Sequence, residues 1–311
     1  MSGSASEKPF NLQNCVICPR NCQADRTSGK LGYCRSGDGF GISSIFAHRG
    51  EEPVISGQHG ICNVFFTHCN MQCIYCQNFQ ISRNIYPDTE GLMELDSVIS
   101  QIESILDQGA TGVGFVSPSH YIPQMRIIME ALSDRGRKPV YVFNTNAYDK
   151  RRTIKMLEHD IDVYLPDLKY MDESLARAYS DAPNYPEIAG EALKEMYNQK
   201  GADIVLDKNG VIKSGITIRH LVLPGHVENS KECLRFIASE ISNDIYISLM
   251  SQYYPTPMVS GHPHLGRYLM REEYEEVLDE FNKLGFWRGW VQELDSPHSY
   301  RPDFAKPEAF D

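Results

Sequence analysis

The chain has 311 residues and a formal net charge of −11; 41% of its residues are hydrophobic and 23% are charged. This composition is typical of a globular protein of one or two domains, and it excludes a mainly disordered, collagen-like or coiled-coil chain. The sequence has no run of about 18 apolar residues, so no membrane span is predicted. The polar start does not resemble a secretory signal. The acidic net charge argues against a nucleic-acid partner.

The predicted elements change character near residue 60. Residues 15–60, after a polar lead, are rich in cysteine and glycine with little periodicity, which predicts a small segment held by a metal rather than by a core. Strands are then predicted at 63–67, 112–116, 139–143, 161–165, 215–223, 244–250 and, as a short last strand, 287–291. Helices are predicted at 96–109, from 123 onward, and at 149–159, 185–200, 231–240 and 272–284. Residues 204–206 and 211–213 flank a predicted hairpin turn.

Strands alternate with helices about six times, which predicts parallel βαβ units in either an open doubly wound sheet or a barrel. We therefore divide the chain into a Cys-rich segment at 1–60, an α/β domain at 61–295 and a C-terminal tail at 296–311, which has three prolines and no periodicity.

The nine cysteines are unevenly distributed. Seven of them fall into two groups, which are Cys15, Cys18, Cys22 and Cys34 near the N-terminus and Cys69, Cys73 and Cys76 after the first α/β strand. Cys62 and Cys233 stand alone and are predicted to be buried small residues. Without a secretion signal we expect a cytoplasmic protein with reduced thiols, so that clustered cysteines indicate metal chemistry rather than disulfides.

The second group has the spacing C-x3-C-x2-C. Three thiolates ligate three irons of a four-iron cluster and leave the fourth iron open. The alternative is a zinc site completed by His68 or by a distant residue, but structural zinc usually has four closed ligands. The spacing therefore favours an incomplete and reactive metal site.

This spacing after the first strand resembles the radical SAM superfamily, over roughly residues 61–250. The resemblance implies a partial (β/α)6 TIM-like barrel with a [4Fe-4S] cluster on the three cysteines, whose open iron binds S-adenosylmethionine. One electron from the cluster cleaves the sulfonium to methionine and a 5′-deoxyadenosyl radical, which abstracts hydrogen from the substrate. It also implies an electron donor such as flavodoxin or ferredoxin.

The resemblance assigns further residues to S-adenosylmethionine. Tyr75 is at the position of an aromatic residue beside the adenine, unless it is a core aromatic. After the second strand the family often has Gly-Gly-Glu, which holds the methionine ammonium. This chain has Ser117 and Ser119 there instead, with an ordinary helix cap by Ser119 as the alternative.

Three more strand ends carry candidate residues, as expected for barrels of this type. Asp167 and Lys169 resemble positions of pyruvate formate-lyase-activating enzyme that help to hold S-adenosylmethionine and a monovalent cation; the alternative is a solvated ion pair. They alternate, so they project to the same side of an extended chain. After the third predicted strand, Asn144 stands where the resemblance implies an aspartate. Arg219, inside a strand, needs a partner, either the carboxylate of S-adenosylmethionine or an internal acid.

Four thiols within twenty residues suit either tetrahedral zinc or a second iron–sulfur cluster. A cluster would relay electrons, whereas zinc would only fold the segment. This segment, together with residues 48–57 and 76–82, resembles an uncharacterised branch of radical SAM proteins related to pyruvate formate-lyase-activating enzyme. In residues 48–57, His48, Glu51 and Glu52 would position substrate or shield the cluster, or form a surface turn.

The sequence thus predicts a radical SAM enzyme, an oxidoreductase similar to activating enzymes. Its substrate is either a protein or peptide, attacked at a backbone α-carbon as in glycyl-radical activation, or a small molecule. The alternative from another class is a non-catalytic iron–sulfur electron carrier or redox sensor. Asp167, Lys169 and Arg219 argue against a carrier, because it has no need for a sulfonium-binding site.

Overall fold

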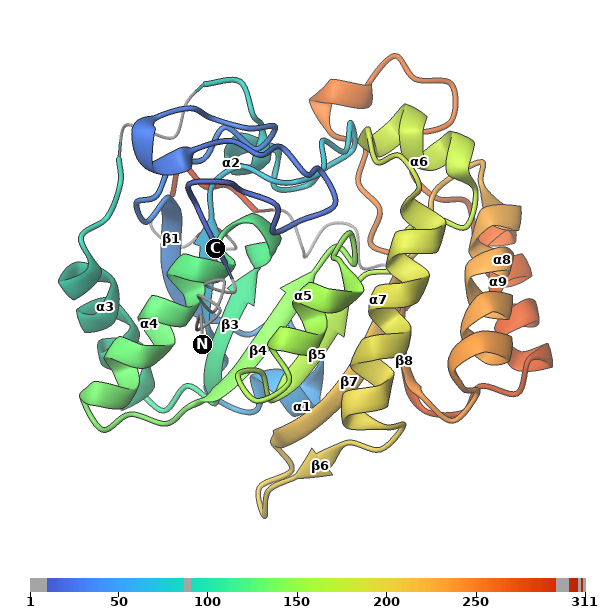
Figure 1. Ribbon diagram of the computed structural model, residues 1–311. Helices are drawn as coiled ribbons and strands as arrows, with labels where there is room; N and C mark the ends of the chain where they lie inside the picture. Colours follow the sequence, from blue (N-terminus) through green and yellow to red (C-terminus); the bar gives the residue numbers. More distant parts are fainter. Residues whose placement is uncertain (1–9, 87–90, 295–301, 307–308, 310–311) are drawn as a thin grey trace, which may run out of the picture.

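The computed structural model describes residues 10–86, 91–294, 302–306 and 309, and a nine-stranded sheet forms its centre (Figure 1). The strands are β1 (Ile42–His48), β2 (Ile61–Phe66), β3 (Gly112–Val116), β4 (Val140–Thr145), β5 (Val163–Pro166), β6 (Val205–Leu206), β7 (Ile212–Leu221), β8 (Tyr246–Met250) and β9 (Gly289–Val291). The helices are α1 (Pro53–Ser56), α2 (Phe79–Ser82), α3 (Leu95–Asp107), α4 (Ile122–Asp134), α5 (Arg151–Met156), α6 (Glu173–Ser180), α7 (Tyr185–Lys200), α8 (Val227–Phe236) and α9 (Arg271–Lys283).

The sheet has the order β1-β2-β3-β4-β5-β7-β8-β9, and β6 pairs with β7. β2 to β5 and β7 to β9 run parallel, whereas β1 is antiparallel to β2 and β6 is antiparallel to β7. Within the described residues, the two edge strands β1 and β9 do not pair with each other, so the sheet stays open. The predicted α/β class is confirmed, and the open sheet is consistent with a partial barrel.

The parallel strands β2 and β3 are buried on both faces, as their short continuous apolar runs predict. Every residue of β2 and β3 is buried. Helices cover the outer face of the sheet, and α3 shows the pattern: its apolar side chains Val98, Ile99 and Ile102 are fully buried. Helical periodicity therefore located these helices correctly, and α7 has both of its predicted ends.

Four elements were not predicted from the sequence, namely β1, α1, α2 and α6. β1 lies within the segment that was expected to depend on a metal, and it pairs with β2 through Ile45↔Val64 and Ala47↔Cys62. Its residues alternate only weakly in hydrophobicity, so a period of two was not apparent. The short helices α1, α2 and α6 were not predicted either, because one or two turns give little periodic signal. Within the described residues, no helix is long and apolar enough to cross a membrane.

The two ends of the sheet differ in what covers them (Figure 1). The N-terminal loops, α2 and α6 lie at the end where the parallel strands finish, and α1 and β6 lie at the opposite end. The register aligns Phe65 with Val116 and Val116 with Asn144. The loops that follow these strands therefore meet at one edge, where barrels of this type carry their active groups.

The predicted C-terminal tail lies partly outside the described residues, as does the start of the polar N-terminal lead at residues 1–9. Of the tail, residues 302–306 and 309 are described. Phe304 packs edge-on against Phe65 with ring centroids 5.3 Å apart, and Ala309 is buried. Part of the tail therefore contacts the end of β2.

Candidate active site

The loop with the three cysteines, residues 69–76, follows β2 and is fixed at its first residue and in its middle. The Gln72 amide donates a hydrogen bond to Ser180 O, at the end of α6, over 3.0 Å. The Asn84 side chain binds the main chain of Cys69 twice: its Nδ2 donates to Cys69 O at 2.8 Å, and its Oδ1 accepts from Cys69 N at 3.1 Å. The loop is thus held by both α6 and the chain that follows it.

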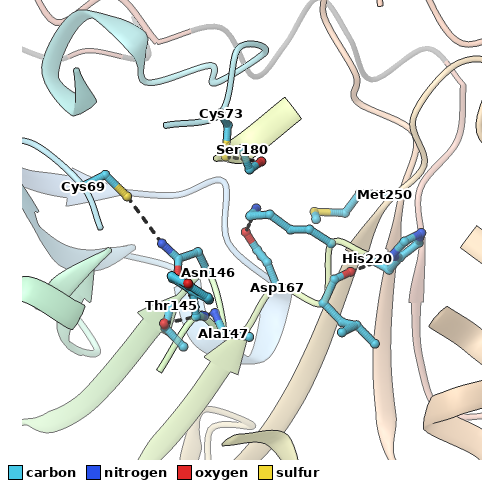
Figure 2. A network of polar contacts seen from close by, with 12 residues as sticks. Cys69, Cys73, Thr145, Asn146, Ala147, Asp167, Ser180, His220 and Met250 are labelled. Atoms are coloured by element: carbon cyan, nitrogen blue, oxygen red, sulfur yellow. Dashed lines mark hydrogen bonds and ion pairs between the residues drawn. The ribbon is translucent and has the colours of Figure 1, made fainter. Parts of the chain in front are cut away.

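Each of the three sulfurs accepts a hydrogen bond from a polar side chain. Two of the bonds are visible in Figure 2: Asn146 Nδ2 donates to Cys69 Sγ at 3.4 Å, and Ser180 Oγ donates to Cys73 Sγ at 3.0 Å. The third runs from Ser82 Oγ to Cys76 Sγ at 3.2 Å. Burial raises the pKa of Cys69 to about 12 and that of Cys73 to about 11, so metal binding must displace their protons. Donors to sulfur stabilise the thiolates that metal binding creates and tune the potential of iron–sulfur clusters. The residues present therefore fit a cluster bound by three thiolates.

The structure brings these three donors together although the sequence analysis missed them. Asn144, near the end of β4, was the candidate, but Asn146, directly after β4, is the residue that reaches a cysteine. The polar run at 144–146 was visible in the sequence, but the sequence did not show which of these side chains faces the cysteines. Ser82 and Ser180 gave no signal, because a single serine in a short helix has no distinguishing pattern.

Tyr75 belongs to the cysteine loop, but its side chain is buried in the core and is only 5% exposed. Its hydroxyl bonds to that of Tyr170 at 2.6 Å, and Tyr170 in turn bonds to Ser180 Oγ at 2.7 Å. Ser180 also donates to Cys73, so a continuous hydrogen-bonded chain joins Tyr75 to a predicted cluster ligand. The adenine contact implied for Tyr75 remains a prediction.

Asp167 and Lys169 form an ion pair at the end of β5, with Lys169 Nζ 2.7 Å from Asp167 Oδ2. Burial disfavours the charged lysine, but Asp167 and the nearby Cys73 outweigh this effect and raise the pKa of Lys169. Lys169 is therefore a fixed positive charge beside the cysteine loop. The two side chains are 18% and 26% exposed for lysine and aspartate, so the pair is largely enclosed rather than fully solvated.

Arg219 finds internal acids. Its Nε donates to Glu52 Oε1 at 2.8 Å, and its Nη2 donates to Glu52 Oε2 at 2.6 Å and also to Glu51 Oε2. Asn63 Nδ2 donates to the remaining oxygen of Glu51 at 2.8 Å. The Glu51 and Glu52 side chains are only 9% and 4% exposed, so the expected alternative of a surface turn is wrong. The expected internal acids therefore do meet Arg219, and its contact with the carboxylate of S-adenosylmethionine remains a prediction.

A polar cavity of about 390 Å³ lies inside the open barrel next to this network. Ser117, Asn144, Asp167 and Arg219 line it, together with His48, Glu51 and Glu52. Ser119 is buried elsewhere: its hydroxyl lies 3.2 Å from Thr145 Oγ1, and it does not cap a helix. Four predicted site residues from four different strands thus share one cavity, which suits a polar ligand.

The N-terminal cysteines lie together although they come from separate turns. Cys15, Cys18, Cys22 and Cys34 all line one small enclosed cavity. Cys18 and Cys34 are buried, Cys15 is partly exposed and Cys22 is exposed. The identity of a metal at this group remains a prediction.

In the described part of the chain, no three His, Cys, Asp or Glu side chains converge closely enough to hold a single metal ion. A four-iron cluster keeps its thiolates farther apart than a single ion does, because an iron atom separates each sulfur from the cluster centre. The fit of the Cys69 group to a cluster therefore rests on its donor set and its surroundings.

Comparisons with known proteins agree with this architecture, although no family model matches the chain. The uncharacterized protein MJ0674 of Methanocaldococcus jannaschii is 28% identical over 273 residues, which cover 86% of this chain and 74% of that protein. Streptococcus suis SuiB, in a structure with its precursor peptide SuiA, has a TM-score of 0.51 and 14% identity. The match covers 75% of this chain but only about half, 48%, of SuiB.

A domain of pyruvate-formate lyase-activating enzyme from Bacteroides vulgatus is also similar. It is 15% identical with a TM-score of 0.42, and the match covers 59% of this chain and 100% of that domain. These structural neighbours are radical SAM enzymes. The SuiB match shows a shared fold, and this fold is consistent with the partial barrel that the C-x3-C-x2-C resemblance implies.

Proposed function

We propose that the protein is a radical SAM enzyme. Cys69, Cys73 and Cys76 bind a [4Fe-4S] cluster, which supplies the electron that cleaves S-adenosylmethionine to methionine and a 5′-deoxyadenosyl radical. The observation that carries this proposal is the placement of three hydrogen-bonded thiols at the carboxyl edge of an open parallel sheet, beside a polar cavity. An electron carrier has no use for such a cavity.

The chain's own residues divide the binding work. Lys169, held by Asp167, places a positive charge next to the cysteines, where it would bind the carboxylate of S-adenosylmethionine. Ser117 and Asn144 offer neutral donors and acceptors in the cavity. We assign Arg219 to a positioning role, since Glu51 and Glu52 already occupy its guanidinium.

The substrate enters the same cavity. Its volume of about 390 Å³ is near the lower end of ordinary ligand sites, so it admits a small molecule or one short segment of a peptide. Both substrate classes remain: a protein or peptide attacked at a backbone α-carbon, as in glycyl-radical activation, and a small polar metabolite. Deuterium transferred from a labelled candidate substrate into 5′-deoxyadenosine would identify the correct class.

The test is the formation of 5′-deoxyadenosine by protein reconstituted with iron and sulfide, given S-adenosylmethionine and dithionite without oxygen. We expect product from the parent and none from Cys73→Ala. Cys233→Ala is the matched control, because Cys233 is a buried thiol on α8, outside both cysteine groups, and its variant should keep the activity. Absence of product from a parent that carries a full cluster, with candidate substrates present, would favour a redox sensor or electron carrier.

A further inference from the structure

The N-terminal cysteines have no role in the function proposed so far, yet the segment that carries them is docked against the catalytic loop. Arg20, between Cys18 and Cys22 in the chain, donates from Nε to Asn70 O at 2.8 Å. Asn70 follows Cys69 directly. The segment therefore touches the loop that we assign to the first cluster.

Two aromatic rings hold Arg20 in this position. Its guanidinium carbon lies 3.5 Å from the centroid of the Tyr33 ring and 5.3 Å from that of Tyr148. Tyr148 O accepts a hydrogen bond from Asn70 Nδ2 at 2.8 Å. A cation between aromatic faces is a specific contact, so the relative position of segment and loop is well defined.

A short path of hydrogen bonds links the two cysteine groups. Tyr33 N donates to Cys22 Sγ at 3.2 Å, and Tyr33 O accepts from Asn84 Nδ2 at 3.0 Å. The same amide group of Asn84 binds Cys69 O at 2.8 Å. Asn84 thus connects the main chain of Tyr33, which bonds to Cys22, with the main chain of Cys69.

Positive charges surround the N-terminal thiols. Arg26 is 2% exposed, donates from Nη1 to His120 O at 2.6 Å and interacts electrostatically with Cys34. Lys150 Nζ donates to Val16 O at 2.6 Å and interacts with Cys15 and Cys18. Fixed cations stabilise the negative charge that four metal-bound thiolates carry.

We propose that Cys15, Cys18, Cys22 and Cys34 bind a second iron–sulfur cluster that passes electrons to the cluster at Cys69, Cys73 and Cys76. This inference rests on the proposed function. Zinc has no redox chemistry and would gain nothing from a direct link to the catalytic loop. Exposure of Cys22 gives a protein electron donor access to this end of the path.

The electron count is simple. One electron from a flavodoxin-type or ferredoxin-type donor enters at the N-terminal thiols, crosses the Tyr33–Asn84–Cys69 contacts and ends in the sulfonium of S-adenosylmethionine. The bond between sulfur and the 5′ carbon breaks, sulfur keeps an electron pair as methionine, and carbon keeps one electron. The donor is oxidised by one electron, and no proton is consumed.

The test measures iron, sulfide and zinc in reconstituted full-length protein, together with electron paramagnetic resonance of the reduced samples. We expect about eight irons per parent chain and about four in a Cys69→Ala, Cys73→Ala, Cys76→Ala triple variant. The spectrum of that variant should not respond to S-adenosylmethionine, because four thiolates leave no open iron. A Cys18→Ser, Cys34→Ser variant should keep about four irons with a spectrum that does respond.

The outcomes separate the two proposals. Zinc without iron in the triple variant overturns the second cluster, even if the Cys18→Ser, Cys34→Ser variant fails to fold. Equal iron in the parent and the triple variant instead contradicts the cluster at Cys69. To test the relay, the rate of 5′-deoxyadenosine formation is measured once with flavodoxin and once with dithionite as the electron source. In the Cys18→Ser, Cys34→Ser variant, the ratio of the flavodoxin-driven rate to the dithionite-driven rate should fall. An unchanged ratio of the two rates overturns electron transfer through the N-terminal site.

Discussion

The two cysteine groups are built in different ways. The Cys69 group lies on a loop between a buried strand and a helix, and each of its sulfurs has a side-chain hydrogen-bond donor. The N-terminal group lies in residues 15–34, where described secondary structure is limited to one 3₁₀ turn and an isolated bridge. The sheet thus holds the Cys69 group, whereas docking contacts hold the N-terminal group.

Left-handed backbone conformations occur near both groups, since His68, directly before Cys69, has a φ of 63°. In the N-terminal segment, the non-glycine residues Asn21, Gln23 and Arg35 have φ values of 48°, 54° and 53°. Left-handed conformations are costly for non-glycine residues and persist only where the surroundings enforce them. The difference teaches that the sheet positions the Cys69 loop, whereas contacts with the barrel position the N-terminal segment.

The largest expected effect tests whether the barrel depends on its internal charges. Arg219→Met would leave the carboxylates of Glu51 and Glu52 buried without their cation. Removing one partner of a buried ion pair typically costs about 3–5 kcal/mol of unfolding free energy. Urea unfolding followed by circular dichroism would measure this loss.

Two further variants sharpen the Arg219 result. Adding Glu51→Gln and Glu52→Gln to Arg219→Met should restore part of the lost stability, because no net charge then stays buried. Arg177→Met is the matched control, as its pair with Glu173 is exposed and worth less than about 1 kcal/mol. Equal losses for Arg219→Met and Arg177→Met would contradict the importance of the buried network.

Next in size is the effect of removing a sulfur donor. Asn146→Ala deletes the hydrogen bond to Cys69 Sγ and should lower the rate of S-adenosylmethionine cleavage about 10-fold to 100-fold, as for other residues that support metal ligands. The reduction potential of the cluster in this variant should become more negative, because the lost hydrogen bond stabilises the reduced cluster, which carries more negative charge. A redox titration followed by electron paramagnetic resonance measures this; unchanged potential and rate would exclude Asn146 from tuning the cluster.

Asp149 gives the barrel a pH dependence. Burial raises the pKa of Asp149 to about 6, although Thr145 and Ser119 donate hydrogen bonds to it. Because the folded pKa is raised, this contribution to stability is complete below the unfolded pKa near 3.8 and is lost as pH rises through about 6. Asp149→Asn removes this loss. As pH rises from about 5 to about 7.5, the unfolding free energy of the variant should therefore increase by roughly 1–2 kcal/mol relative to that of the parent.

Urea unfolding at the two pH values checks the Asp149 prediction. Asp107→Asn is a suitable control, since Asp107 is an exposed acid on α3. A relative stability of Asp149→Asn that does not change with pH would mean that the Asp149 carboxyl ionises normally.

The smallest expected effect concerns docking of the N-terminal segment. Arg20→Ala removes the hydrogen bond to Asn70 and the stacking on Tyr33, together worth about 1–2 kcal/mol. Amide hydrogen exchange should become faster in residues 15–34 and stay unchanged in β2 to β5. Lys30→Ala, at an exposed position of the same segment, is the control. Faster exchange throughout the barrel would contradict the separate anchoring of the two regions.

The sequence determined the local elements and one motif. Short apolar runs and helical periodicity located the strands of the partial barrel and the long helices, because burial requires those residue types wherever a strand or helix meets the core. The cysteines at 69, 73 and 76 were found by spacing alone, since ligands from one loop must be close in the chain.

Tertiary structure decided the partners. Arg219 meets Glu51 and Glu52 across more than 160 residues, Cys69 receives its hydrogen bond from Asn146 rather than Asn144, and Asn84 joins the two cysteine groups. These choices depend on strand order, register and the side of the chain on which a residue points. Local periodicity sets only which residues are buried, so contacts between distant segments appear only when the sheet is assembled.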